Sequence, residues 1–291
     1  MARVWLASFP KCGNTWMRAL LANLGREEAG EEDALSLQGG IASSRQRMDD
    51  SIMFASGLLT HDECDRLRPA VYRHYGAHED DEDGPPQLAG TRFMKTHDAW
   101  TLTDRGEPLM GGAGAARAAV LIVRDPRDVA CSFANHRNRS IDDTIAMMAD
   151  PDSSLADATD RMPLQLRQQL LGWSGFNRSW LDQTEIPVHL LRYEDLLADT
   201  AGTLAGLLSA LGLAVDAGAI ARAVELSRFD VLREHEARFG FREAPKRMSA
   251  GRFFRSGRAG GWREELTPAQ SEQILADHGE MMRRCGYLAE A

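Results

Sequence analysis

The chain has 291 residues, with 43% hydrophobic and 26% charged residues, which is ordinary for a globular protein with a substantial core. Its net charge of −9 argues against a general nucleic-acid-binding protein, because such proteins carry a basic surface. The four cysteines lack Cys-x-x-Cys spacing and a histidine cluster, so we expect reduced thiols and neither a zinc site nor a disulfide framework. The N-terminus has no leader-like pattern and no apolar run is long enough to cross a membrane, so we expect a soluble cytoplasmic protein.

The N-terminal stretch predicts a strand, a tight turn and a helix. Val4–Phe9 is an apolar run typical of a strand, and Met17–Leu24 is a run of good helix formers that ends at Gly25. The turn between them contains Lys11 and Gly13. Helix N-termini offer unpaired N–H donors and partial positive charge, so this turn predicts a phosphate-binding loop, with an ordinary strand-to-helix turn as the alternative.

The next part of the chain is less regular. Arg26–Ser56 shows no clear periodicity and begins with acidic residues, which indicates a solvated segment. Thr60 with Glu63 three residues later predicts the start of a helix, in which Pro69 predicts a kink or a division into two short helices. The acidic run within Ala77–Pro86 predicts an exposed loop.

Strands and helices alternate through the remainder. Further strands are predicted at Thr91–His97, Ala118–Val123 and Val188–Arg192. Helices are predicted over Ile141–Met148, Pro163–Gln183, Thr203–Leu211, Asp216–Leu226 and Thr267–Cys285. This alternation predicts an α/β fold in three layers, with a largely parallel central sheet flanked by helices. No repeat or linker divides the chain, so we expect one domain over residues 1–291.

The first loop resembles a known nucleotide-binding motif. Pro10-Lys11-x-Gly13-x-Thr15-Trp16 is similar to the loop that binds the 5′-phosphosulfate in cytosolic-type sulfotransferases that use 3′-phosphoadenosine 5′-phosphosulfate (PAPS). The resemblance implies a P-loop-NTPase-like sulfotransferase fold. It also implies that the nucleotide is held by Lys11, Cys12, Gly13, Asn14, Thr15 and Trp16.

A second motif forms the end of the second predicted strand. A lone histidine in such a place is usually structural, but Lys95-Thr96-His97 is similar to the family's Lys-Thr-His. The resemblance implies that His97 removes the proton of the acceptor hydroxyl, for which a neutral imidazole is well suited. Lys95 and Lys11 would then stabilise the transferring charge.

Three more motifs occur in the family's order. Arg124-Asp-Pro-Arg-Asp resembles the second nucleotide signature and implies that Arg124 and Ser132 bind the 3′-phosphate, although alone it could be an exposed ion-pair turn. Arg-Tyr-Glu-Asp-Leu at 192–196 resembles the segment whose tyrosine lies on the adenine side, and Phe253 to Trp262 resembles the loop that covers the 3′-phosphate. The residues implied by these segments and by a Ser-x-Phe between them are Tyr193, Ser227, Phe229, Phe253, Phe254, Arg255, Ser256 and Gly257. Ser256 and Gly261 stand where the family has lysine and aspartate, and Arg258 could replace that lysine.

The resemblance implies in-line transfer of a sulfuryl group from PAPS to a hydroxyl, less readily an amine, of a small-molecule, glycan or lipid acceptor. PAP (adenosine 3′,5′-bisphosphate) would be the product, with no metal, no nucleic-acid partner and a possible homodimer. The Ala/Arg-rich composition is typical of bacterial proteins. A P-loop small-molecule kinase and a catalytically silent nucleotide-binding protein remain as alternatives. The resemblance is weakest over Arg26–Gly90 and Ser140–Ile186, where we expect the residues that determine acceptor specificity.

Overall fold

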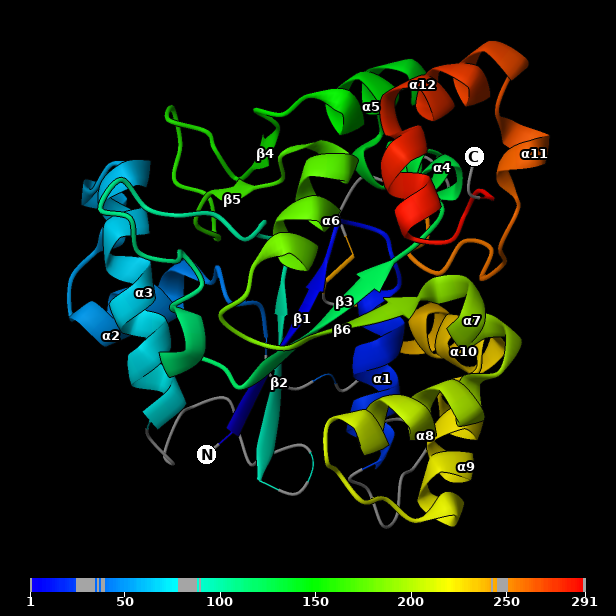
Figure 1. Cartoon of the computed structure of the whole chain (residues 1–291), viewed down its shortest axis with the longest axis horizontal. Helices are drawn as coiled ribbons and strands as arrows, with labels where there is room; N and C mark the ends of the chain where they lie inside the picture. The colour runs from blue at the N-terminus through cyan, green and yellow to red at the C-terminus, as the bar shows by residue number, and fades with distance from the viewer. Residues whose placement is uncertain are drawn as a thin grey trace. The chain divides into compact units, whose positions relative to one another are not determined.

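The apolar runs of the sequence form the main sheet. A computed structural model describes residues 2–24, 35, 37, 40–77, 88, 90–241, 243–244 and 251–289. Over these residues the main sheet has four strands in the order β2-β1-β3-β6 (Figure 1). They are β1 (Ala2–Ser8), β2 (Thr91–Thr96), β3 (Ala118–Val123) and β6 (Val188–Arg192). The predicted α/β class, with a parallel central sheet flanked by helices, is confirmed.

The contacts within the chain divide it into two units. Unit 1 comprises Met1–Phe9, Gly39–Leu121 and Asp150–Leu190. Unit 2 comprises Pro10–Gln38, Ile122–Ala149 and Leu191–Ala291. Strands β3 and β6 begin in unit 1 and end in unit 2, and the loop that follows β1 belongs to unit 2.

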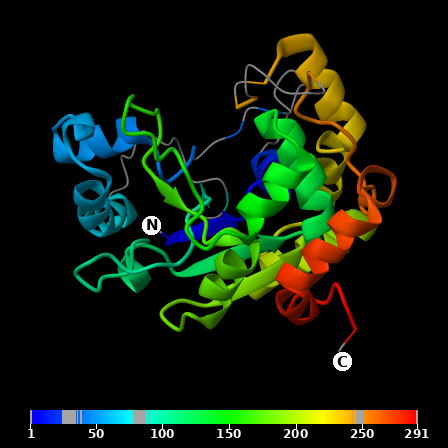
Figure 2. The ribbon, with the colours of Figure 1, turned by 90° about the horizontal axis from the view of Figure 1, so that it is seen from above.

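Unit 1 adds helices and a short antiparallel pair to the strands. These elements are α2 (Arg45–Ile52), α3 (His61–Ala77), α6 (Gly172–Asp182), β4 (Ser154–Leu155), β5 (Gln168–Gln169) and 3₁₀ turns at Ser56–Leu58 and Gly112–Gly114. Helices α2 and α3 lie side by side in Figures 1 and 2. The Trp5 ring of β1 meets the Tyr72 ring of α3 edge to face, with centroids 5.5 Å apart, so aromatic packing fixes α3 against the sheet.

Helix α3 begins as the sequence predicts but is not divided. The Glu63 carboxylate accepts from the Thr60 N–H at 2.8 Å, and the Thr60 hydroxyl accepts from the Glu63 N–H at 3.3 Å, which completes the capping box. Pro69 lies inside one continuous helix, so of the two predicted alternatives, a kink or two short helices, the division is wrong. The buried Tyr72 side chain packs on Trp5, and such apolar contacts offset the cost of about 3 kcal/mol for an interior proline.

The helix predicted over Pro163–Gln183 is too long. Only its second half is helical, because α6 begins at Gly172. Leu171 and Gly172 have φ values of 57° and 66°, in the left-handed region that interrupts a helix. The Leu166 N–H instead donates to the Ser43 carbonyl at 2.7 Å, so the preceding residues pair with another segment of unit 1.

Unit 2 is helical over most of its described length. Its helices are α1 (Asn14–Leu24), α4 (Pro126–Arg137), α5 (Ile141–Ala149), α7 (Tyr193–Ala198), α8 (Thr200–Ala210), α9 (Ala217–Leu226), α10 (Phe229–Phe239), α11 (Trp262–Glu265) and α12 (Pro268–Arg284). Thr267 and Gln270 form a capping box at the start of α12, as the predicted boundary implies. Helices α2, α7, α10 and α11 were not predicted.

Two predictions fall on residues that the structure does not describe. The acidic start of Arg26–Ser56 and all but the first residue of the loop at Ala77–Pro86 lie outside the described residues. Within the described part of the chain, none of the helices combines the length and apolar character needed to cross a membrane.

Candidate active site

The first loop bends where the sequence predicts a phosphate-binding turn. Lys11 has a φ of 70° and Gly13 a φ of 102°, and α1 starts directly afterwards at Asn14. A Cβ atom on Gly13 would lie 2.7 Å from Cδ2 of Tyr193, so only glycine allows this close approach. The turn therefore presents the N-terminus of α1, with its backbone donors and partial positive charge, next to the Lys11 cation.

Cys12 contributes to the loop through packing. Its side chain is buried, and this burial raises the pKa of the thiol, so the sulfur stays protonated at neutral pH. The thiol points at the Pro10 carbonyl, 3.9 Å away. A protonated buried thiol is a poor nucleophile, so the loop offers an anion its backbone and Lys11, not a thiolate.

Arg124 joins the first loop to the last one. It directly follows β3 and lies over the Tyr193 ring at 4.4 Å. Its two terminal nitrogens donate to the carbonyls of Lys11, at 3.3 Å, and of Arg258, at 3.0 Å. One guanidinium thus contacts residues of three other motifs, which the sequence spreads from Lys11 to Arg258.

The predicted adenine-side residues also meet within unit 2. Trp16 and Tyr193 are edge to face, with ring centroids 5.7 Å apart. The Trp16 indole donates to the Ser227 carbonyl at 2.9 Å, and Asn23 donates to the Ser227 hydroxyl at 2.9 Å. Ser227 is the C-cap of α9, and Phe229 begins the next helix, α10. The Ser-x-Phe segment is therefore fastened to α1.

The last loop contacts Lys11 through an aromatic ring. The Lys11 ammonium lies 3.8 Å from the centre of the Phe253 ring, which is close enough for a cation–π contact. Phe253 packs edge to face on Phe254, and Phe254 packs on Phe229. Gly257 has a φ of 61°, and a Cβ atom there would collide with the Phe229 ring. The loop thus depends on glycine for its path.

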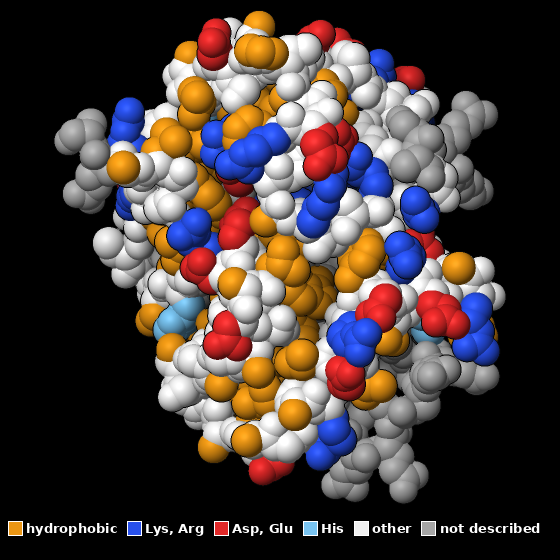
Figure 3. Space-filling model, turned by 90° about the vertical axis from the view of Figure 1, so that its right-hand side faces the viewer, with side chains coloured by type: hydrophobic (Ala, Val, Ile, Leu, Met, Phe, Trp, Pro, Cys, Tyr) orange, Lys and Arg blue, Asp and Glu red, His pale blue; other side chains and the backbone are white. Residues whose placement is uncertain are grey.

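The cations of the last loop have acidic partners. Arg255 makes two hydrogen bonds to Glu265, of 2.7 and 2.8 Å, and Arg258 pairs with Glu264. Figure 3 shows that basic and acidic side chains are interspersed on the face it displays. Arg255 and Arg258 must therefore exchange a carboxylate for a phosphate if they bind one.

Four predicted site residues differ in how far solvent reaches them. Ser132 is half-buried on α4, and Ser256 is exposed between Arg255 and Gly257. Asn14 and Thr15 are buried at the start of α1. The structure brings Lys11, Gly13, Trp16 and Tyr193 together in unit 2, and the roles of all the predicted site residues stay predictions.

Sequence reasoning missed the acids that hold these loops. Asp128 accepts hydrogen bonds from the N–H groups of Gly260, at 2.6 Å, and Trp262, at 2.9 Å. Glu194 accepts from the Asp125 N–H at 3.0 Å and from the Tyr287 hydroxyl at 2.8 Å, and burial raises its pKa. Glu194 stands inside the Arg-Tyr-Glu-Asp motif and could have been found there, whereas no pattern marks Tyr287.

The candidate base, His97, lies in unit 1. The strand register pairs Ala7 with Thr96, which places Ser8 beside His97. The His97 Nδ1 atom is 2.7 Å from the Ser8 carbonyl oxygen. Because a carbonyl only accepts, Nδ1 carries the hydrogen, and Nε2 is left as the basic nitrogen. His97 and Lys95 are half-buried, so solvent reaches both. Their predicted meeting with Lys11 joins the two units and stays a prediction.

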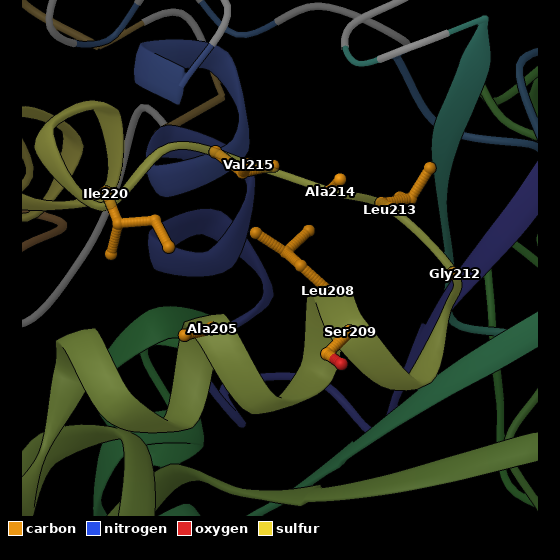
Figure 4. A pocket seen from close by; sticks show the side chains of 8 residues that line it. All are labelled: Ala205, Leu208, Ser209, Gly212, Leu213, Ala214, Val215 and Ile220. Atoms are coloured by element: carbon orange, nitrogen blue, oxygen red, sulfur yellow. The ribbon is translucent and has the colours of Figure 1, made fainter.

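A separate hollow in unit 2 has a different character. Its volume is about 390 Å³, and it lies between α8, α9 and the connecting residues Gly212–Val215 (Figure 4). Its lining is apolar apart from Ser209, with Leu208 and Ile220 on opposite helices. No charged side chain lines it, so it cannot hold a phosphate. Among the described residues, no three His, Cys, Asp or Glu side chains gather as they do in a metal site.

Comparisons with known proteins show the fold to which this chain is similar. The structure resembles retinol dehydratase in complex with androsterone and PAP, with a TM-score of 0.59 and 19% identity over 96% of this chain and 80% of that one. It also resembles mouse sulfotransferase SULT7A1 complexed with PAP, with a TM-score of 0.57 and 17% identity over 97% of this chain and 85% of that one. The predicted sulfotransferase fold is confirmed.

Sequence comparison extends this likeness. Sulfotransferase 2A6 of Rattus norvegicus is 26% identical over 161 residues, which are 53% of this chain and 52% of the relative. The matched region thus spans about half the length of that curated relative. The model of the sulfotransferase domain family matches residues 2–286. This chain therefore belongs to the sulfotransferase domain family.

Proposed function

We propose that this chain, as one domain over residues 1–291, transfers a sulfuryl group from PAPS to an acceptor hydroxyl and releases PAP. Family membership supports the reaction class. The PAP named in the descriptions of the two similar structures supports the nucleotide, and the alcohol androsterone named with one of them supports a hydroxyl acceptor.

The observation that carries the proposal is the meeting of distant motifs inside unit 2. Arg124 contacts the Lys11 carbonyl, the Tyr193 ring and the Arg258 carbonyl, while Lys11 lies on the Phe253 ring. Such side chains fit a ligand with both phosphate groups and a purine, because cations bind the phosphates and rings pack on the base. The missing Cβ of Gly13 leaves room for the Tyr193 ring, which lies against the first loop.

Each residue then has a distinct role. PAPS supplies the sulfuryl group when bound. Lys11 stabilises the negative charge that grows on the departing 5′-phosphate, and Lys95 stabilises charge on the sulfuryl oxygens. Nε2 of His97 takes the proton of the attacking hydroxyl, because its Nδ1–H is occupied by the Ser8 carbonyl. Arg124 and Arg255 bind the 3′-phosphate, for which Arg255 gives up Glu265.

The test begins with the nucleotide. Calorimetric titration with PAP is expected to show one site per chain, and labelled PAPS with a panel of hydroxylated compounds is expected to give a sulfated product. Lys11→Ala is expected to lower kcat/KM at least about 100-fold, the scale of losing one transition-state charge contact. His97→Ala is expected to lower kcat by about 100-fold with an unchanged Kd for PAP.

The matched control for Lys11→Ala is Arg222→Ala, which removes one exposed positive charge from α9 in the same unit. It should leave kcat/KM and the Kd for PAP unchanged. Magnesium-dependent consumption of ATP without use of PAPS would identify a kinase instead. Binding of PAP without transfer to any acceptor would identify a silent nucleotide-binding protein. Either result overturns the proposal.

A further inference from the structure

A buried arginine lies behind the strand end that carries His97. Arg68 of α3 is 0% exposed, and so is its partner Asp98. The guanidinium donates to the Asp98 carboxylate at 2.6 Å, to the Tyr72 hydroxyl at 2.9 Å and to the Arg167 carbonyl at 2.9 Å. It also pairs with Asp65 at 3.2 Å. Each terminal nitrogen of Arg68 is thus engaged inside unit 1, which fixes the guanidinium in one place.

The same contacts hold the peptide on both sides of His97. The Asp98 N–H donates to the Thr96 hydroxyl at 3.0 Å, and that hydroxyl donates to the Asp98 carboxylate at 3.3 Å. The Asp98 carbonyl accepts from the Trp180 indole of α6 at 3.0 Å. Thr96 and Asp98 are therefore fixed through side chains, and His97 is the residue between them.

The imidazole itself is restrained by Ser8, whose carbonyl oxygen lies 2.7 Å and whose hydroxyl lies 3.4 Å from Nδ1. Its Nδ1–H donates to the Ser8 carbonyl at the end of β1. This bond fixes the tautomer, but it allows the ring to move with its own backbone. The direction in which Nε2 points therefore depends on where residues 96–98 lie, and Arg68 holds these residues through the Asp98 carboxylate.

Stability alone does not account for this cluster. Removing two charges from water costs about as much as their attraction returns, and apolar residues of similar volume often replace a buried ion pair without loss. In addition, the second carboxylate oxygen of Asp98 has no hydrogen-bond partner among the described residues. The arrangement is better explained by a need for defined geometry than by a gain in stability.

We propose that Arg68 is a positioning residue for His97. Through Asp98 it fixes the peptide that carries the imidazole, so that Nε2 faces the acceptor hydroxyl and takes its proton. The inference rests on the proposed function, since it assigns His97 as the base. It predicts that loosening Arg68 affects proton transfer and spares nucleotide binding.

The main experiment is the double variant Arg68→Met/Asp98→Leu, which removes both charges and leaves neither unpaired. We expect a folded protein whose kcat falls about 10- to 100-fold, because a misplacement of about 1 Å costs up to 100-fold. The KM for PAPS and the Kd for PAP should stay within about twofold. Arg66→Gln is the matched control, because it removes an exposed arginine of α3 that pairs with Asp104, and its kcat should equal that of the wild type.

A second readout does not depend on turnover. Imidazole ¹⁵N shifts, with the His97 signal assigned by its loss in His97→Asn, should show Nδ1–H with a fixed ring in the wild type. The double variant should show averaged tautomers. If no acceptor is ever sulfated, the proposed function fails while this measurement still decides whether Arg68 positions His97.

Should the double variant melt below the assay temperature, Thr96→Val loosens the same peptide with almost no change in volume. We then expect averaged tautomers and a kcat at least about threefold lower with an unchanged KM, the lower end of what misplacement of a base costs. A folded variant of either kind with wild-type kcat and an unchanged His97 tautomer overturns the inference.

Discussion

The ion pair behind His97 in unit 1 is buried, whereas the ion pairs of the last loop in unit 2 reach solvent. Arg68 and Asp98 of unit 1 are both 0% exposed. In unit 2 the side chains of Arg255 and Glu265 are 26% and 29% exposed, and those of Arg258 and Glu264 are 49% and 67% exposed. A buried pair cannot exchange its partner without leaving a charge unpaired, whereas an exposed pair is balanced by water. The Arg68–Asp98 pair is therefore suited to hold a geometry, and the pairs of the last loop to release cations to an incoming anion.

The largest test of this comparison removes one carboxylate charge from each unit. Asp98→Asn removes the shorter carboxylate contact of buried Arg68, leaves Asp65 at 3.2 Å as its carboxylate partner, and should cost about 3–5 kcal/mol in the free energy of unfolding. Glu264→Gln should leave the free energy of unfolding almost unchanged, because Arg258 remains hydrated. Urea denaturation measures both. Equal losses of unfolding free energy in the two variants would show that burial of the ion pair does not set the cost of removing its carboxylate.

A buried histidine in unit 2 tests whether burial, not location, sets the cost. His278 of α12 is buried, and desolvation lowers its pKa from 6.5 to about 4. Between these pH values the unfolded chain binds a proton that the folded chain does not, so stability falls as the pH drops from 6.5 to 4, by about 3 kcal/mol in total.

Melting temperatures measured across this pH range check the prediction. His278→Gln removes the titrating group, so its melting temperature should depend less on pH than that of the wild type. Equal pH dependence in the two proteins would show that His278 is not the group responsible.

The backbone conformation of the first loop, in unit 2, should also make the protein sensitive to substitution. Gly13→Ala puts a Cβ atom 2.7 Å from the Tyr193 ring at a φ of 102°, and we expect a loss of about 2 kcal/mol in stability together with a lower affinity for PAP. Gly206→Ala in α8 is the control, since nothing lies within 4 Å of its Cβ position. It should stabilise the helix by about 0.5–1 kcal/mol. A tolerated Gly13→Ala would contradict a closely packed first loop.

The sequence predicted elements that local chemistry determines. The run Ala118–Val123 is apolar throughout and became β3, and Thr60 with Glu63 began α3. Helix α2 was missed because it has one buried apolar residue, Met48, and relies on a buried arginine, although its N-cap Ser44 was a usable signal. The helix over Pro163–Gln183 was predicted too long because left-handed backbone at Leu171 depends on pairing with distant residues.

The site was predictable only as motifs. Lys11, Arg124 and Tyr193 could be named from their order in the chain, and they lie in contact in unit 2, while their roles stay predictions. Arg68 and Asp98 could not be named, because they lie 30 residues apart and neither belongs to a motif. Only the packing of α3 against the end of β2 makes them neighbours, and the sequence does not show this packing.

The smallest expected effect concerns the exchange of partners in unit 2. Glu265→Gln removes the carboxylate that holds Arg255 through two hydrogen bonds and leaves the guanidinium available to a phosphate. We expect PAP to bind about threefold to tenfold more tightly at low salt, which corresponds to roughly 1 kcal/mol for an exposed ion pair that need not be broken first. The gain should shrink as salt is added, because salt screens both the pair and the ligand.

Glu264→Gln should give a smaller gain, since Arg258 is the more exposed of the two arginines. Calorimetric titrations at two salt concentrations separate these cases. Weaker binding by Glu265→Gln would mean that the carboxylate orients Arg255 for the phosphate instead of competing with it.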